Sequence, residues 1–94
     1  MNERRIFAKA LDTYGVMSQI LMTFEEMSEL QKALCKFFRG EHDIVEDTAA
    51  IAEEIADVEI MLTQMKQLFV LEDAVDYARQ FKVARLAERL GMEG

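Results

Sequence analysis

The sequence contains no proline, and its four glycines stand at positions 15, 40, 91 and 94. Proline and glycine are the residues that most often interrupt regular structure, so their scarcity predicts long helices with breaks near positions 15 and 40. Hydrophobic residues make up 51% of the 94 positions, which argues against disorder. A chain of this length is one domain or one subunit, and it buries a modest share of its surface, so self-association is expected.

Cysteine occurs once, at position 35, so the chain cannot form an internal disulfide. No secretory signal is visible, and no apolar run reaches the length of about 18 residues that could cross a bilayer. Basic residues are also scarce. The sequence has 11 Lys and Arg against 18 Asp and Glu, which gives a net charge of −7. This balance argues against nucleic acid or an anionic membrane as the main partner. We therefore expect a cytoplasmic protein that binds neither.

The breaks divide the chain into four predicted helices, which cover about residues 2–13, 16–39, 43–69 and 72–90. Gly40 suits the left-handed position after the end of the second helix. Asp43 and Glu46 have the spacing of a capping box that opens the third helix. Two of the four helices exceed twenty residues, and long helices joined by short turns pack antiparallel. The sequence therefore predicts an all-α, up-and-down four-helix module.

The two longest predicted helices place carboxylates inside the apolar stripe that should face the core. Successive residues turn by about 100° around a helix axis. On that basis Glu26 falls inside the apolar arc of the second helix and Glu29 on its border. Glu54 falls inside the arc of the third helix and Asp57 on its edge. Each helix thus carries one acid within its apolar face and another three residues along.

Buried carboxylates are neutralised, paired or bound to metal, because burying an isolated one is costly. No basic residue occupies a matching position on these two helices, and converging carboxylates raise one another's pKa. Mg²⁺ and Mn²⁺ prefer oxygen ligands, and an i, i+3 acid pair on each of two facing helices could surround one or two such ions. The alternative is that the acids line the rim of a dimer interface and meet lysines of another chain. Di-iron and zinc sites are disfavoured, because the only histidine, His42, falls in a predicted turn.

The segments EEMSE (25–29) and EIAD (54–57), with 24 residues between them, resemble a known paired signature. It is the E-E-x-x-E … E-x-x-D pattern of the MazG-like nucleoside triphosphate pyrophosphohydrolases. They belong to the all-α NTP pyrophosphatase superfamily, with the dimeric dUTPases and dCTP pyrophosphatases. The resemblance covers about residues 14–90 and makes residues 1–94 a single MazG-like domain. It implies hydrolysis of a (deoxy)nucleoside triphosphate between the α and β phosphates, giving a monophosphate and pyrophosphate, as a house-cleaning of the nucleotide pool.

By this resemblance the Mg²⁺ ligands, with Mn²⁺ as a substitute, would be Glu26, Glu29, Glu54 and Asp57. Glu25 and Glu53 match the leading acids of the two doublets, and they would act in catalysis by holding water or orienting the nucleophile. The alternative is that Glu25 and Glu53 are both ordinary solvated acids on the surface.

Substrate contacts are expected from two other places. Lys82, Arg85 and Arg89 recur at i, i+3, i+7 on the fourth helix and could bind phosphates, although a solvated helix end favoured by the dipole explains them as well. Gln19 lies two turns before Glu26 on the same face and could reach the base or ribose. A structural hydrogen bond across a subunit interface would explain the polar side chain of Gln19 on this face equally well.

Three functions remain open at this stage. The first is a Mg²⁺-dependent pyrophosphohydrolase, the second a non-catalytic metal- or nucleotide-binding helical module, and the third a structural oligomer whose acids give interface specificity. Acids at inward positions favour the first two. The chain lacks the extra helices that serve larger relatives as lids, so we expect a dimer or a dimer of dimers in which another subunit completes the pocket.

Overall fold

The computed structural model describes residues 1–92, which form α1 (Glu3–Tyr14), α2 (Val16–Arg39), α3 (Ile44–Leu68) and α4 (Glu72–Arg89). No strand occurs in this range, so the predicted all-α class is confirmed, and the predicted helix ends agree to within one or two residues. Within the same range no helix combines the length and the apolar character needed to traverse a bilayer.

The ends of the helices follow from local chemistry. Asn2 caps α1, since its side-chain oxygen accepts a hydrogen bond of 3.1 Å from the Arg5 amide. Gly40 ends α2 in the left-handed conformation, with φ 68° and ψ 25°, which a residue without a Cβ adopts freely. Asp43 then caps α3 by accepting a bond of 2.8 Å from the Val45 amide. The predicted stop and restart around residues 40–43 are therefore confirmed.

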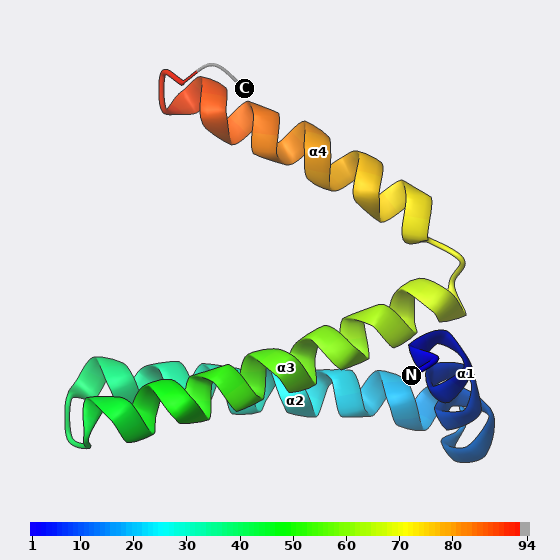
Figure 1. Cartoon of the computed structure of the whole chain (residues 1–94), viewed down its shortest axis with the longest axis horizontal. Helices are drawn as coiled ribbons and strands as arrows, with labels where there is room; N and C mark the ends of the chain where they lie inside the picture. The colour runs from blue at the N-terminus through cyan, green and yellow to red at the C-terminus, as the bar shows by residue number, and fades with distance from the viewer. Residues whose placement is uncertain (93–94) are drawn as a thin grey trace.

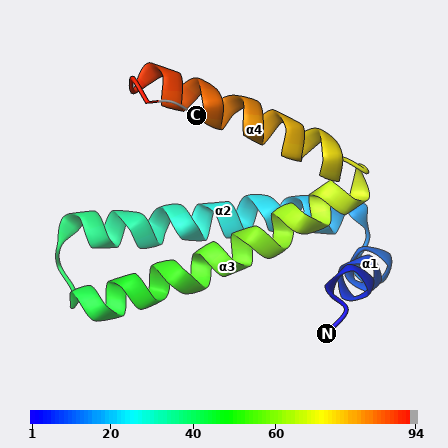
Figure 2. The same ribbon diagram turned by 45° about the horizontal axis from the view of Figure 1, so that its top comes forward.

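Helices α2 and α3 form an antiparallel hairpin and lie side by side along most of their length (Figures 1 and 2). The line of contact between them, called the seam below, is unusually polar. Its buried side chains are Gln19, Thr23, Ala33, Asp47, Met61 and Gln64. Four of these six are polar, so the most deeply buried positions of the seam contribute little hydrophobic burial.

Helix α1 runs across the end of the hairpin that lies away from the α2–α3 turn (Figures 1 and 2). Its one buried side chain is Phe7. Arg4 ties this helix to the junction between α3 and α4: its guanidinium lies 2.6 Å from a carboxylate oxygen of Glu72, and its carbonyl oxygen accepts a bond of 3.1 Å from Gln67 Nε2. The hairpin and α1 thus form one packed unit.

Helix α4 leaves this unit at Val70 and diverges from α3 (Figure 1). Val70 has a positive φ of 54°, and the Leu71 amide donates to the Lys66 carbonyl, so α3 ends in a Schellman motif with valine where glycine is usual. No residue of α4 is buried. The antiparallel packing predicted from sequence is present between α2 and α3, whereas α4 adds no further layer within the chain.

Candidate metal site

Three acids meet across the seam near the middle of the hairpin. Glu26 of α2 and Glu54 and Asp57 of α3 each offer a carboxylate oxygen, and the three oxygens lie within 4.8 Å of one another. Glu54 and Asp57 share a helix face because they are three residues apart, and the antiparallel register brings Glu26 beside them. Mg²⁺ binds oxygen at about 2.1 Å, so ligands on opposite sides of one ion are about 4.2 Å apart. The observed limit of 4.8 Å is somewhat above that value, so the three carboxylates would have to move slightly together to ligate one ion.

The electrostatics of this acidic triad are unfavourable as it stands. The pKa of Glu26 is raised, first because the carboxyl is partly desolvated and then because the charges of Asp57 and Glu54 repel its own. Oxygen Oε2 of Glu54 is buried and accepts no hydrogen bond from residues 1–92. No member of the triad takes part in a salt bridge among residues 1–92. A hard divalent cation would remove each of these penalties, so the donor set fits such an ion.

Glu29, the fourth ligand expected from the resemblance, lies outside the triad. Its Oε1 pairs with Nζ of Lys32 at 3.3 Å, one turn along the same helix. Glu29 instead shares a recess of about 130 Å³ with Glu54, and the other lining residues are Lys32, Ala33, Lys36, Asp47 and Ala50. This space is large enough to admit water. Glu54 therefore stands between the triad and a small solvent-sized space.

Asp47 is a residue of this recess that sequence reasoning missed. It is 7% exposed, which is rare for a carboxylate. The signal was available in the spacing, because Asp47 lies seven residues before Glu54 and so points the same way from α3. An acid in the first turn of a helix is also favoured by the helix dipole, so its position alone does not mark it as a site residue.

The predicted catalytic acids Glu25 and Glu53 are both exposed. Glu25 is close enough to Glu26 for its charge to raise the pKa of Glu26 further. Gln19 lies in the seam and is 5% exposed. Its backbone carbonyl accepts a hydrogen bond of 2.9 Å from the Thr23 hydroxyl. The Gln19 side chain is therefore closed to solvent within the single chain.

The predicted phosphate-binding residues Lys82, Arg85 and Arg89 are not brought to the triad within one chain. All three lie on α4, whose contacts with α3 are few and which diverges from the hairpin (Figure 1). The Arg85 guanidinium instead sits 5.9 Å from the centre of the Phe81 ring, on the same helix.

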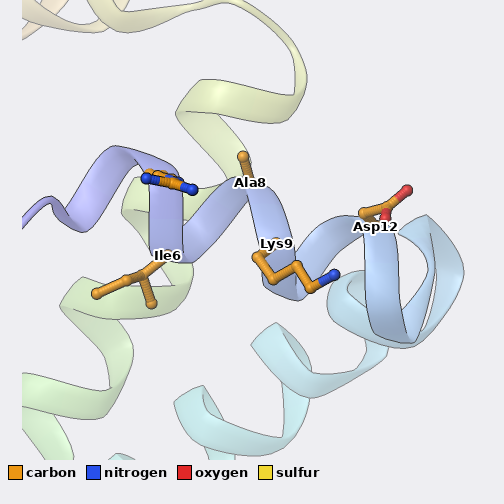
Figure 3. Close-up of a pocket in the computed structure, with 5 residues that line it drawn as sticks. Ile6, Ala8, Lys9 and Asp12 are labelled. Carbon is orange, nitrogen blue, oxygen red and sulfur yellow. The ribbon is translucent and has the colours of Figure 1, made fainter.

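A broader hollow of about 660 Å³ lies elsewhere, on the outer surface of α1 (Figure 3). Its lining residues are Arg5, Ile6, Ala8, Lys9 and Asp12. All five belong to one helix, so the hollow is an open surface without groups from a second element, and none of the carboxylates of the triad faces it.

Comparisons of the chain with models of known protein families, with curated proteins and with solved structures find no match. The resemblance to MazG-like enzymes accordingly rests on the paired acidic signature alone. The structure adds that three of the signature acids converge in space.

Proposed function

We propose that this protein is a Mg²⁺-dependent nucleoside triphosphate pyrophosphohydrolase that releases pyrophosphate from (d)NTPs. The observation that carries the proposal is the meeting of Glu26, Glu54 and Asp57 across the seam, with the Glu54 Oε2 atom buried and unpaired. These residues belong to the E-E-x-x-E and E-x-x-D segments, so the pattern and the geometry point to the same atoms.

The roles of the acids follow from their surroundings. Glu26, Glu54 and Asp57 would hold the cation, with Glu29 joining them once it leaves Lys32. When bound, Mg²⁺ or Mn²⁺ neutralises charge on phosphate oxygens and lowers the pKa of a water molecule. Glu25 is exposed next to the triad, where it could accept a proton from an attacking water.

Cationic side chains are available for the phosphates in two positions. Lys32 and Lys36 line the recess beside Glu54 and can offset the negative charge of a triphosphate tail there. Lys82, Arg85 and Arg89 of α4 would reach the phosphates only if α4 moved or if another copy supplied them. A site completed by another subunit accords with the expected dimer or dimer of dimers.

The test is release of pyrophosphate from a panel of canonical and modified NTPs and dNTPs, with Mg²⁺ and with EDTA. Glu54→Gln keeps the size of the side chain and removes the ligand charge, and we expect it to lower turnover roughly 100-fold or more, the usual scale for one preorganised electrostatic group. Glu59→Gln is the matched control, since Glu59 is an exposed acid on the same helix. Equal turnover in both variants, or full activity in EDTA, would contradict the proposal.

A second candidate is a non-catalytic metal-binding helical module. The small recess favours it, because about 130 Å³ cannot enclose a nucleoside triphosphate and Gln19 is closed to solvent. Mg²⁺ binding that depends on Glu54, without pyrophosphate release from any nucleotide, would identify this function.

A further inference from the structure

Asp47 is a buried acid that the proposed metal site does not use. Its side chain is 7% exposed, and its carboxylate forms no hydrogen bond and no salt bridge with any group among residues 1–92. The helix dipole does not account for this burial, because Glu46 stands in the same first turn of α3 and is exposed. A buried carboxylate without a partner is costly, so a cationic partner for Asp47 is expected.

The recess beside Glu54 contains two cations that could be this partner. Asp47 lines the recess together with Lys32 and Lys36 of α2, and no other basic residue lines it. Lys32 already pairs with Glu29 of its own helix, with 3.3 Å between Nζ and Oε1. Lys36 is exposed and forms no salt bridge in the described part of the chain. Lys36 is therefore the cation that is available to Asp47.

The register of the hairpin places Lys36 and Asp47 at the same level. Glu26 and Asp57 are level with each other, because their carboxylates meet across the seam. Lys36 lies ten residues after Glu26 on α2, and Asp47 lies ten residues before Asp57 on α3. The two helices are antiparallel and both rise by about 1.5 Å per residue, so these equal steps end opposite each other. The flexible stem of a lysine can cross a recess of about 130 Å³.

We infer that Asp47 is a positioning residue for Lys36: its carboxylate pairs with the Lys36 ammonium and holds that charge in the recess. The recess extends to Glu54, so the ammonium faces the space beside the metal site. Because the lysine is already ordered, it loses less conformational entropy when it binds an oxyanion. The oxyanion is a phosphate group of the nucleotide, and this assignment rests on the proposed function.

A double-variant cycle on stability tests the pairing independently of any activity. Urea denaturation of the full chain is measured at one protein concentration in EDTA. Lys36→Met leaves Asp47 as an uncompensated buried charge, so it should lower the urea midpoint of the native chain. In the Asp47→Asn background no such charge remains, and the same change should have little effect. Lys32→Met, one turn earlier on α2, is the matched control and should have the same effect in both backgrounds.

An equal loss from Lys36→Met in both backgrounds would overturn the inference, and so would coupling of Asp47 to Lys32 in its place. Should Lys36→Met fail to fold, NMR of the Lys36 ammonium decides, because an ion pair slows the exchange of its protons with water. The signal should be visible in the native chain, lost in Asp47→Asn and kept in Glu46→Gln, which changes the exposed neighbouring acid. A signal that Asp47→Asn leaves unchanged would contradict the pairing.

The role towards the oxyanion is tested by KM and kcat for the nucleotide that the native chain hydrolyses fastest. Asp47→Asn should raise KM roughly tenfold or more, the scale of one hydrogen bond to a charged group, and leave kcat unchanged. Lys36→Met should raise KM by the same factor, and the two changes together should do no more. An unchanged KM in Asp47→Asn would refute the positioning role. No turnover by the native chain would refute the proposed function alone, because the stability cycle still decides on the pairing.

Discussion

The carboxylate of Glu26 on α2 lies within 4.8 Å of the carboxylate of Asp57 on α3. Two acids at this separation across a polar seam oppose the pairing of the two helices that hold the fold together. The triad therefore links protonation to stability, and the proposed metal binding would act on the same three carboxylates.

The first prediction concerns pH in the absence of divalent metal. The pKa of Glu26 is raised above its ordinary value of 4.5 in the folded chain, so the folded state binds this proton more tightly than the unfolded state. The stabilisation from the proton is complete below pH 4.5 and is lost as pH rises through the folded pKa. Urea denaturation of the EDTA-treated protein between pH 4 and 7 should show this decline.

The matching variant for the pH measurement is Glu26→Gln, which keeps the size of the side chain and removes its charge. It should be more stable than the native chain at pH 7 without metal and should flatten the pH dependence in that window. Glu59→Gln, which changes an exposed acid on α3, should leave the slope as it is. A native-like slope in Glu26→Gln would place the linkage on another group.

The second prediction concerns the cation. The proposed site would bind Mg²⁺ or Mn²⁺ in the folded chain and not in the unfolded one, so the ion should raise the melting temperature, with a gain of about 2.7 kcal/mol at a hundredfold excess over the dissociation constant. Thermal denaturation with increasing Mg²⁺ measures the gain. Glu54→Gln should abolish it, and a metal response that survives this change would mean that the ion binds elsewhere.

The third prediction concerns Val70, whose φ of 54° is unfavourable for a β-branched residue. The side chain is 80% exposed, so its removal costs little packing. Val70→Gly should relieve a strain of about 1–2 kcal/mol and lose part of it to chain entropy, for a net gain of about 0.5–1 kcal/mol. Urea denaturation measures this difference.

Gly91, which has a φ of 71° at the end of α4, provides the reciprocal change for this measurement. Gly91→Val should destabilise the chain, because it places a β-branched residue in the same left-handed position. If both changes lower the stability, the backbone at Val70 is not strained.

The fourth prediction concerns the ion pair between Arg4 and Glu72, 2.6 Å apart. The hydrogen bond from Arg4 lowers the pKa of the Glu72 carboxyl in the folded chain. The contribution of this ion pair to stability is present above pH 4.5, the ordinary pKa of a glutamate, and is lost as pH falls through the lowered pKa of Glu72 in the folded chain. Arg4→Gln should return the pKa of Glu72 towards 4.5 in an NMR titration. Arg5→Gln changes the adjacent arginine, which forms no salt bridge among residues 1–92, and should leave that pKa lowered.

The bounds of the helices could be predicted because helix ends depend on local interactions. Gly40 and Asp43 decide the end of α2 and the start of α3 through their own backbone and side-chain bonds. The direction of α4 was not predictable, since it depends on the conformation of Val70 and on few contacts with the rest of the chain.

The candidate site was predictable in part for a similar reason. Helical spacing placed Glu26 and Glu54 on facing sides of two helices, and the structure has them there. Spacing cannot tell whether an acid at the border, such as Glu29, turns inward or pairs with a lysine one turn away. Asp47 was missed because an acid near a helix start has an ordinary explanation.

The triad takes one acid from α2 and two from α3, so a cation held there would cross-link the two helices near the middle of the hairpin. A cross-link of this kind suppresses local opening of the segments that it joins. Backbone amides of α2 and α3 near the triad should then exchange with solvent deuterium more slowly in Mg²⁺ than in EDTA. The amides of α4, which has no buried residue, should exchange at the same rate in both.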